Sequence, residues 1–192
     1  SVTTVRDRLR VLSWGVDAQT FGENGFWSLG QNFAMGLPLA GDGHPLTSRG
    51  AESSFFKISG DVRRVQKLPW GLKGTVSGGY QVSPDKLVPA EQIFLGGASS
   101  VRGYPESDYG ADQSVYSSME IQVPAYFFPK EWTVPFTESK WRDVVHGVGF
   151  VDYGYGRLRD PSSTERRSRN MLSAGGGLII RLFKNLFARF EW

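Results

Sequence analysis

Apolar and polar side chains alternate along most of this chain. In the stretch 115–123, for example, Val115 and Ile121 share one face while Ser118 and Glu120 share the other. A repeat of two residues is typical of a β-strand, whose successive side chains point to opposite faces. We therefore expect about eight strands, over 9–20, 26–37, 54–65, 71–82, 113–123, 145–155, 171–182 and 185–192. Most have the roughly 9–11 residues that a tilted strand needs to cross a bilayer.

The strand ends and the connections favour a transmembrane barrel over the alternative, a soluble β-sandwich. Aromatic residues stand near the predicted strand ends, where a membrane has its interfacial belts: Trp14, Trp27, Trp70, Tyr80, Tyr153 and Trp192. Short turns (22–25, 67–70, 183–185) alternate with long polar segments (38–53, 83–112, 156–170), as in outer-membrane barrels. The exception is 124–144, which is long and proline-rich, and we expect it to be an ordered connection. The predicted fold class is all-β, an antiparallel transmembrane β-barrel.

The barrel interpretation also predicts which side chains face lipid. On the apolar face of the alternation these are Leu72, Val76, Val115, Ile121, Leu178, Ile180, Leu186 and Phe190. A soluble sandwich would instead bury these residues between two sheets.

Composition narrows the function classes. The chain has 192 residues, 22 basic against 19 acidic, and no concentrated basic run, which argues against a nucleic-acid partner. The absence of cysteine excludes disulfides and thiolate metal sites. The mean hydropathy of −0.30 is compatible with a barrel, because half of each barrel strand faces water. We expect no cofactor.

Other candidate sites carry little weight. Glu120 and Asp152 could form a glycosidase-like acid pair, but the sequence supplies no substrate cleft around them. His44 and His146 lack spaced partners for a metal. The triple glycine 175–177 lacks the Lys-Ser/Thr of a phosphate loop, and the basic segment 160–169 is typical of a solvated loop. We expect no enzymatic activity.

The region 81–124 resembles a known signature. It contains Leu95-Gly96-Gly97, then Val101-Arg102-Gly103-Tyr104, then a strand with Glu120 that ends at Pro124. "GFVDYGYG" (149–156) and "SAGGGLIIRL" (173–182) follow in the expected order. The chain is similar to the BamA/TpsB superfamily of outer-membrane insertases and secretion pores. It is closest to the two-partner secretion branch (ShlB/FhaC-like), because Gln81, Ser83, Leu87, Glu91 and Gln92 precede the glycine pair.

The resemblance implies a role for the arginine. In that superfamily the long loop folds back into the barrel lumen, and its arginine reaches acidic residues on the inner wall. Carried over, Arg102 would contact Asp152 and Glu120, both on the polar face of their strands. Gly96, Gly97 and Gly103 would let the loop turn sharply against the wall, with Val101 and Tyr104 completing the motif. Taken without the resemblance, Arg102 would be a solvated loop arginine.

The strand count raises the question of completeness. We expect residues 1–192 to be a transmembrane β-barrel region with a lumen-directed loop 83–112, as the C-terminal half of a sixteen-stranded barrel. A closed barrel of eight strands has a lumen filled by its own side chains and could not admit that loop. The strands near 9–20 and 185–192 should then lack a backbone partner on one side. The competing interpretation takes Phe190 and Trp192 as the terminal signal of a complete small barrel.

The predicted function is protein transport across the bacterial outer membrane, as a two-partner secretion pore that exports haemolysin- or adhesin-type proteins. The expected partners are outer-membrane lipid, a secreted polypeptide, the remaining barrel strands and the periplasmic domains. Two alternatives stay open: a BamA-like insertase of β-barrels, and a small structural or passive-pore barrel.

Overall fold

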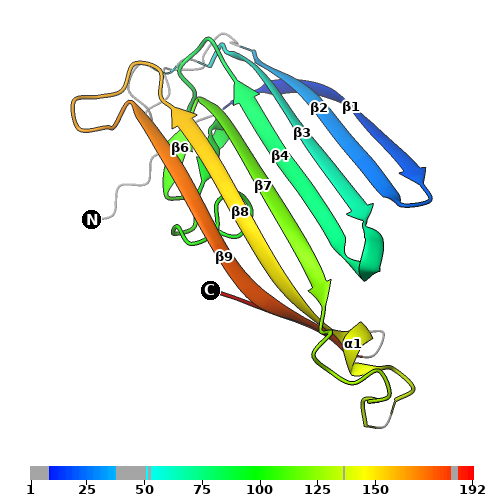
Figure 1. The fold of residues 1–192 in the computed structure, drawn as a ribbon. Helices are drawn as coiled ribbons and strands as arrows, with labels where there is room; N and C mark the ends of the chain where they lie inside the picture. The colour runs from blue at the N-terminus through cyan, green and yellow to red at the C-terminus, as the bar shows by residue number, and fades with distance from the viewer. Residues whose placement is uncertain (1–8, 38–50, 52, 136, 183–185) are drawn as a thin grey trace.

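The computed structural model of the chain describes residues 9–37, 51, 53–135, 137–182 and 186–192. Eight long strands form one antiparallel sheet in the order β1-β2-β3-β4-β7-β8-β9-β10 (Figure 1). The strands are β1 (Val11–Gly22), β2 (Gly25–Gly36), β3 (Phe56–Lys67), β4 (Lys73–Val82), β7 (Gln113–Pro124), β8 (Val145–Arg157), β9 (Ser168–Leu182) and β10 (Leu186–Glu191). This sheet is the wall of a partial β-barrel, which confirms the predicted fold class.

The strand boundaries follow the alternation to within three residues: β1 lies two residues later than the predicted 9–20, and β9 begins three residues before the predicted 171. Strand β3 lies two residues later than the predicted 54–65, and β4 begins at Lys73 instead of residue 71. Between them the chain makes a 3₁₀ turn over Pro69–Gly71, in which Trp70 adopts a positive φ of 59°. This turn takes up two residues that the alternation assigned to β4.

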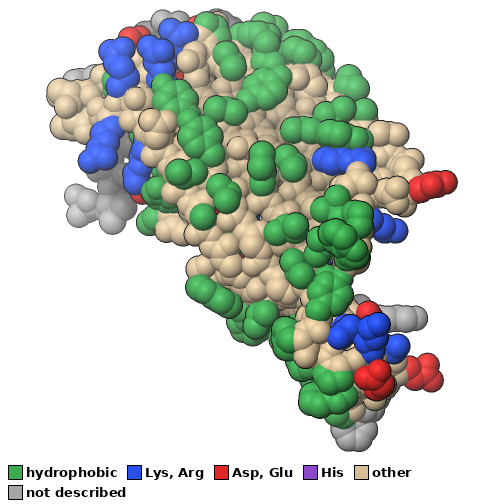
Figure 2. Space-filling view, viewed as in Figure 1, with side chains coloured by type: hydrophobic (Ala, Val, Ile, Leu, Met, Phe, Trp, Pro, Cys, Tyr) green, Lys and Arg blue, Asp and Glu red, His purple; other side chains and the backbone are tan. Residues whose placement is uncertain are grey.

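One face of the sheet is apolar and exposed. Of the eight residues predicted to face lipid, six are exposed and two are half-buried. The six are Val76, Val115, Ile121, Leu178, Leu186 and Phe190. Figure 2 shows this face as a band of hydrophobic side chains, with charged side chains gathered toward the ends of the strands. The two exceptions are Leu72, beside the 3₁₀ turn, and Ile180, which packs against the connection 125–144.

The six aromatic residues predicted for the interfacial belts are all exposed, but one of them lies level with the middle of the sheet and not near its ends. Trp14, Trp27, Trp70, Tyr80 and Tyr153 lie near the ends of strands or in a turn. Trp192 instead exchanges backbone hydrogen bonds with Gly176, midway along β9. For Trp192 the predicted place in a belt is therefore wrong, because β10 ends before it reaches the far end of β9.

The connections sort to the two ends of the sheet. The turns after β1 and β3, and the paired residues Leu182 and Leu186 of β9 and β10, lie at one end of the sheet, which we call the short-turn end. The segments 83–112 and 158–167 lie at the other end. The connection 125–144 lies at the short-turn end and is ordered, with a bridge between Thr133 and Lys140 and the helical turn α1 (Trp141–Val144). No described helix is long and apolar enough to cross a membrane.

The two edge strands each have a single neighbour. Within the described residues β1 pairs only with β2, and β10 pairs only with β9. The sheet is therefore open, as predicted, and the closed eight-stranded barrel is not observed.

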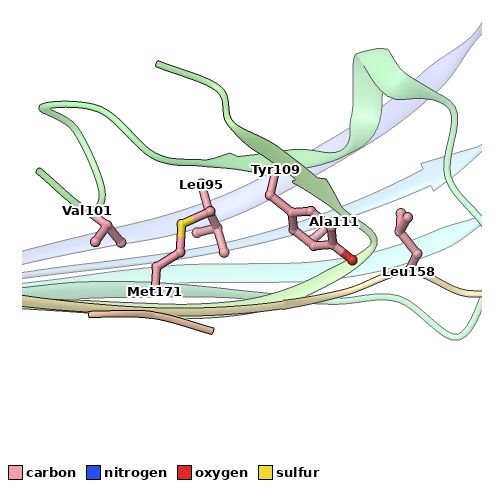
Figure 3. Close-up of a cluster of buried hydrophobic side chains, with 6 residues drawn as sticks. All are labelled: Leu95, Val101, Tyr109, Ala111, Leu158 and Met171. Carbon is pink, nitrogen blue, oxygen red and sulfur yellow. The ribbon is translucent and has the colours of Figure 1, made fainter. Parts of the chain in front are cut away.

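The long segment 83–112 folds back against the inner face of the sheet, which is the face opposite the apolar band. It contains a 3₁₀ turn (Pro89–Glu91) and a short hairpin made of β5 (Ile93–Leu95) and β6 (Tyr109–Ala111). Figure 1 shows β6 behind the sheet. A buried apolar cluster joins this hairpin to the wall (Figure 3). Its members are Leu95, Val101, Tyr109, Ala111, Leu158 and Met171.

Candidate functional site: the arginine loop and its acidic wall

The tip of the loop is held on the wall by one apolar and one polar side chain in succession. Val101 is completely buried in the apolar cluster. The wall makes room for it at Gly154, where an added Cβ would lie 2.7 Å from the Cγ2 atom of Val101. Because the backbone of Val101 is fixed in this way, the next residue, Arg102, is directed along the inner face.

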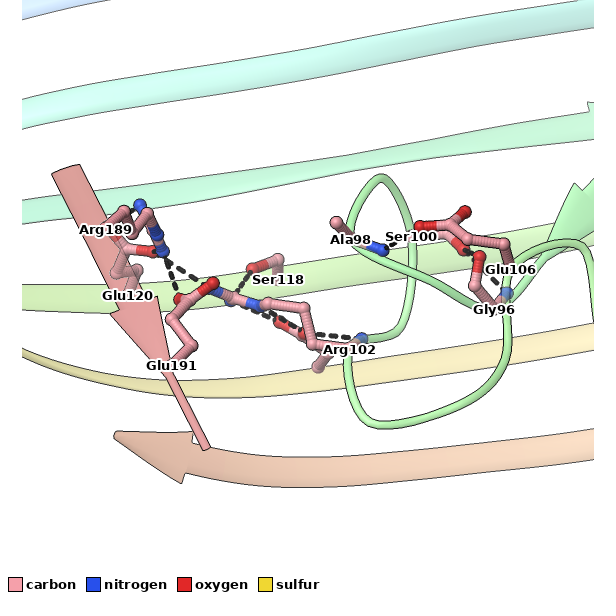
Figure 4. A network of polar contacts seen from close by, with 10 residues as sticks. Gly96, Ala98, Ser100, Arg102, Glu106, Ser118, Glu120, Arg189 and Glu191 are labelled. Carbon is pink, nitrogen blue, oxygen red and sulfur yellow. Dashed lines mark hydrogen bonds and ion pairs between the residues drawn. The ribbon is translucent and has the colours of Figure 1, made fainter. Parts of the chain in front are cut away.

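The backbone of the tip depends on three glycines. Gly96, Gly97 and Gly103 have φ angles of +107°, +86° and +83°, a left-handed region that glycine enters without the steric cost of a Cβ. A Cβ at Gly97 would also collide with the carboxylate of Glu106. Glu106 accepts a hydrogen bond from the backbone N–H of Ala98 (2.9 Å), which closes the tip on itself (Figure 4).

Arg102 uses its whole guanidinium group (Figure 4). Its Nε and Nη2 atoms donate to the two carboxylate oxygens of Asp152, each at 2.7 Å, and its backbone N–H donates to the same carboxylate at 3.0 Å. Nη1 donates to Glu120 at 3.0 Å and to Glu191 at 2.8 Å. Nη2 also donates to the Ser118 hydroxyl at 2.9 Å. The structure thus brings Arg102 together with both acidic residues named from the sequence.

The surroundings strengthen these contacts. Asp152 is only 1% exposed, and the guanidinium carbon lies 3.5 Å from the centre of the Phe150 ring. Burial by itself lowers the pKa of Arg102, but the hydrogen bonds to Asp152 and Glu120 outweigh it and raise that pKa. Arg102 is therefore a permanent cation, and its planar fork matches the carboxylate of Asp152.

Two further residues of this network were missed by the sequence reasoning. Arg189 donates to Glu120 at 2.5 Å and also contacts Glu191. Arg189 and Glu191 both lie on the polar face of β10, a strand that the alternation predicted. What the alternation did not reveal is that the loop tip reaches as far as β10.

The base of the loop is fixed by a buried carboxylate that the sequence also did not reveal. Asp112 is fully buried and accepts hydrogen bonds from the backbone N–H of Leu87 (3.0 Å), from Gln92 Nε2 (2.9 Å) and from the backbone N–H of Arg159 (2.7 Å). It therefore ties both ends of the segment 83–112 to the connection after β8. A single Asp next to a strand forms no periodic pattern. Its role could not be predicted without knowing the path of the loop.

The remaining candidates are placed as follows. Tyr104 packs against the apolar cluster, and its hydroxyl donates to the Leu172 carbonyl at 3.3 Å. His146 lies on β8, and His44 falls outside the described residues. Across the part of the chain that the structure describes, no group of three or more His, Cys, Asp or Glu side chains is arranged to hold a metal. The carboxylates of Glu120 and Asp152, considered as an acid pair, are both engaged by Arg102.

Comparison with known proteins decides the family. Residues 1–180 match the family of haemolysin secretion/activation proteins ShlB/FhaC/HecB. The chain belongs to this family. The resemblance predicted from the motif around Arg102 is thereby confirmed, and with it the location in the outer membrane.

The chain is also similar to two other proteins over part of their lengths. Its fold is similar to that of CdiB from Escherichia coli, with a TM-score of 0.64 and 24% sequence identity over 89% of this chain. It is also 32% identical over 102 residues to outer envelope protein 80, chloroplastic, of Arabidopsis thaliana, a match that covers 52% of this chain. The chain spans 30% of the length of CdiB and the match covers 12% of the plant protein.

Proposed function

We propose that residues 1–192 form the barrel portion of a transporter that exports haemolysin- or adhesin-type polypeptides across the bacterial outer membrane. Support comes from membership of the haemolysin secretion/activation family over residues 1–180. It comes also from an open transmembrane wall whose inner face is polar. In this proposal further strands of the full-length protein close the barrel, and periplasmic domains deliver the client.

The observation that carries the proposal is the docked loop. A segment from the long-loop end returns to the inner face and is held there by Arg102 through three carboxylates. A pore that passes an unfolded chain needs a defined path along such a face. In the proposed mechanism, Arg102 is a positioning residue: it braces the tip of 83–112 against β7 and β8 and so sets the width of that path. Gly96, Gly97, Val101, Gly103 and Tyr104 give the tip its shape.

The test uses the full-length protein in its own host. Proteins released into the medium are compared by mass spectrometry between cells that carry the wild type, Arg102→Ala, Arg102→Lys or no protein. We expect one or a few large polypeptides to be released by the wild type and lost with Arg102→Ala, while the variant barrel still reaches the outer membrane. An unchanged set of released proteins in cells without the protein would refute export.

The same cells distinguish export from the alternative function as an insertase of β-barrels. If the protein assembled other barrels, its removal would lower the amounts of many outer-membrane barrels and leave the released proteins unaffected. A passive pore would do neither and would differ only in conductance.

A further inference from the structure

Beneath the loop tip, the inner face contains a charged cavity of about 580 Å³. It is lined by β3, β4, β7, β8, β9 and β10 together with the tip. Five cationic side chains and three carboxylates line it. The cations are Arg63, Lys73, Arg102, Arg181 and Arg189, and the carboxylates are Glu120, Asp152 and Glu191.

All three carboxylates are already engaged. Asp152 is bound by Arg102, and Glu120 and Glu191 are each bound by both Arg102 and Arg189. Arg102 and Arg189 thus form all the ion pairs of these carboxylates. Five cations against three carboxylates give the cavity lining a net charge of +2, and the three cations without an ion pair are the other three residues.

Those three residues, Arg63, Lys73 and Arg181, we term the cationic ledge. Within the described ranges, no carboxylate forms an ion pair with any of them. Arg181 donates to a neutral acceptor, the Oε1 atom of Gln122, at 3.0 Å. Gln122 in turn is the cross-strand partner of Lys73. The ledge therefore holds like charges on one surface, an arrangement that repulsion disfavours unless an anion balances it.

The position of the ledge suggests what the anion is. Lys73 is the first residue of β4 and Arg181 is the last but one of β9, so both stand at the short-turn end of the sheet. His146 lies on the inner face at the same end, and its buried Nδ1 atom has no hydrogen-bond partner among the residues described. If the protein is the proposed transporter, this end is the periplasmic mouth, where a client chain arrives.

We infer that the cationic ledge binds carboxylate side chains of an acidic segment of the polypeptide that moves along the inner face. Arginine forks and a lysine ammonium are the groups that hold carboxylates most strongly. A side chain in extended backbone recurs on the same face every second residue, so a run of acidic residues would present several carboxylates to the ledge. Lys73 and Arg181 lie at the short-turn end, and Arg63 is in register with Ser118 and Asp152, which Arg102 contacts. The ledge would therefore lead the client from the mouth to the docked tip.

The inference rests on the proposed function for its occupant, but its test does not depend on export. Binding of fluorescein-labelled hexaglutamate to the purified full-length protein is measured by fluorescence anisotropy. The variants are R63Q/K73Q/R181Q, the single variant K73R, and R166Q as a control. Arg166 is an exposed arginine of the connection after β8, at the opposite end of the sheet. Heat-modifiable migration on gels checks that each variant barrel is folded.

We expect the triple variant to weaken hexaglutamate binding about tenfold or more, which corresponds to about 1.4 kcal/mol. K73R and R166Q should bind like the wild type, and added salt should weaken binding of the wild type. Equal binding by the folded triple variant would overturn the inference, as would equal binding of labelled hexalysine. Competition by inorganic phosphate at concentrations where free glutamate has no effect would assign the ledge to small oxyanions and overturn it too.

The outcomes also separate this inference from the proposed function. A protein that exports its client but does not bind hexaglutamate contradicts the ledge alone. A protein that binds hexaglutamate through the ledge but releases no polypeptide from cells contradicts export and leaves the anion site in place.

Discussion

Replacing Arg102 by alanine should release the loop tip from the wall without unfolding the barrel. The substitution removes both 2.7 Å bonds to Asp152 and leaves that carboxylate 1% exposed. Removing one partner of a buried ion pair costs about 3–5 kcal/mol. The cavity of about 580 Å³ beside the pair admits water, and Glu120 keeps Arg189. We therefore expect the lower figure, about 3 kcal/mol, for the free energy of undocking.

Amide hydrogen exchange of the full-length protein measures this free energy locally. The reporters are the amide of Gly96, which donates to the Ser100 hydroxyl at 2.8 Å, and the amide of Gly97, which donates to the Tyr104 carbonyl at 3.1 Å. A loss of about 3 kcal/mol should speed their exchange roughly a hundredfold, since 1.4 kcal/mol is a factor of ten. Amides in the middle of β8 should keep their protection, because the strand ladder does not involve the tip.

A double variant provides the control. In R102A/D152N the unpaired charge is removed while a side-chain oxygen stays in place to accept the backbone N–H of residue 102, so exchange at the tip should be slower than in R102A. Arg166→Ala, which changes an exposed arginine at the long-loop end, should leave the reporters unchanged. If R102A exchanged like the wild type, the ion pair would not hold the tip and the reasoning from burial would be refuted.

Three further outcomes are expected. Asp112→Ala should strand the backbone N–H of Arg159 and other donors at the base of the loop, costing about 1–3 kcal/mol, and limited proteolysis should then cut within 83–92. Gly154→Val should displace Val101, since even a Cβ would lie 2.7 Å from it, and should speed exchange at the tip while the barrel remains folded. Met119→Arg places a charge on the apolar face at mid-strand, where Met119 is 61% exposed, and should lower the free energy of unfolding in bilayers by ~2–4 kcal/mol. An unchanged urea midpoint would mean that this face does not contact lipid.

The strands of the sheet could be predicted from the sequence because their alternation of apolar and polar residues is a local pattern. Alternation shows which residues share a face, and it correctly assigned Glu120 of β7 and Asp152 of β8 to the polar face. It could not report contacts that depend on the path of a loop. The hairpin of β5 and β6 has three residues in each strand, too few for a periodic signal. The roles of Asp112 and Glu191 depend on where that hairpin carries the chain.

The same distinction explains the errors. The late start of β4 comes from the 3₁₀ turn over Pro69–Gly71, in which Trp70 has a positive φ that its residue type does not predict. Trp192 was predicted to lie in a belt because it ends the predicted strand 185–192, but its height in a tilted sheet depends on the register of β10 with β9 and not on its position in the sequence.

The contact between Arg102 and Glu191 has a mechanical consequence. Among the described residues, β10 has a single backbone neighbour and is therefore held by fewer backbone hydrogen bonds than the inner strands. Its inward side chains Arg189 and Glu191 are joined to Glu120 and Arg102. A displacement of β10 along β9 would therefore move the loop tip through these ion pairs. The position of β10 and the position of the tip are coupled through the guanidinium group of Arg102.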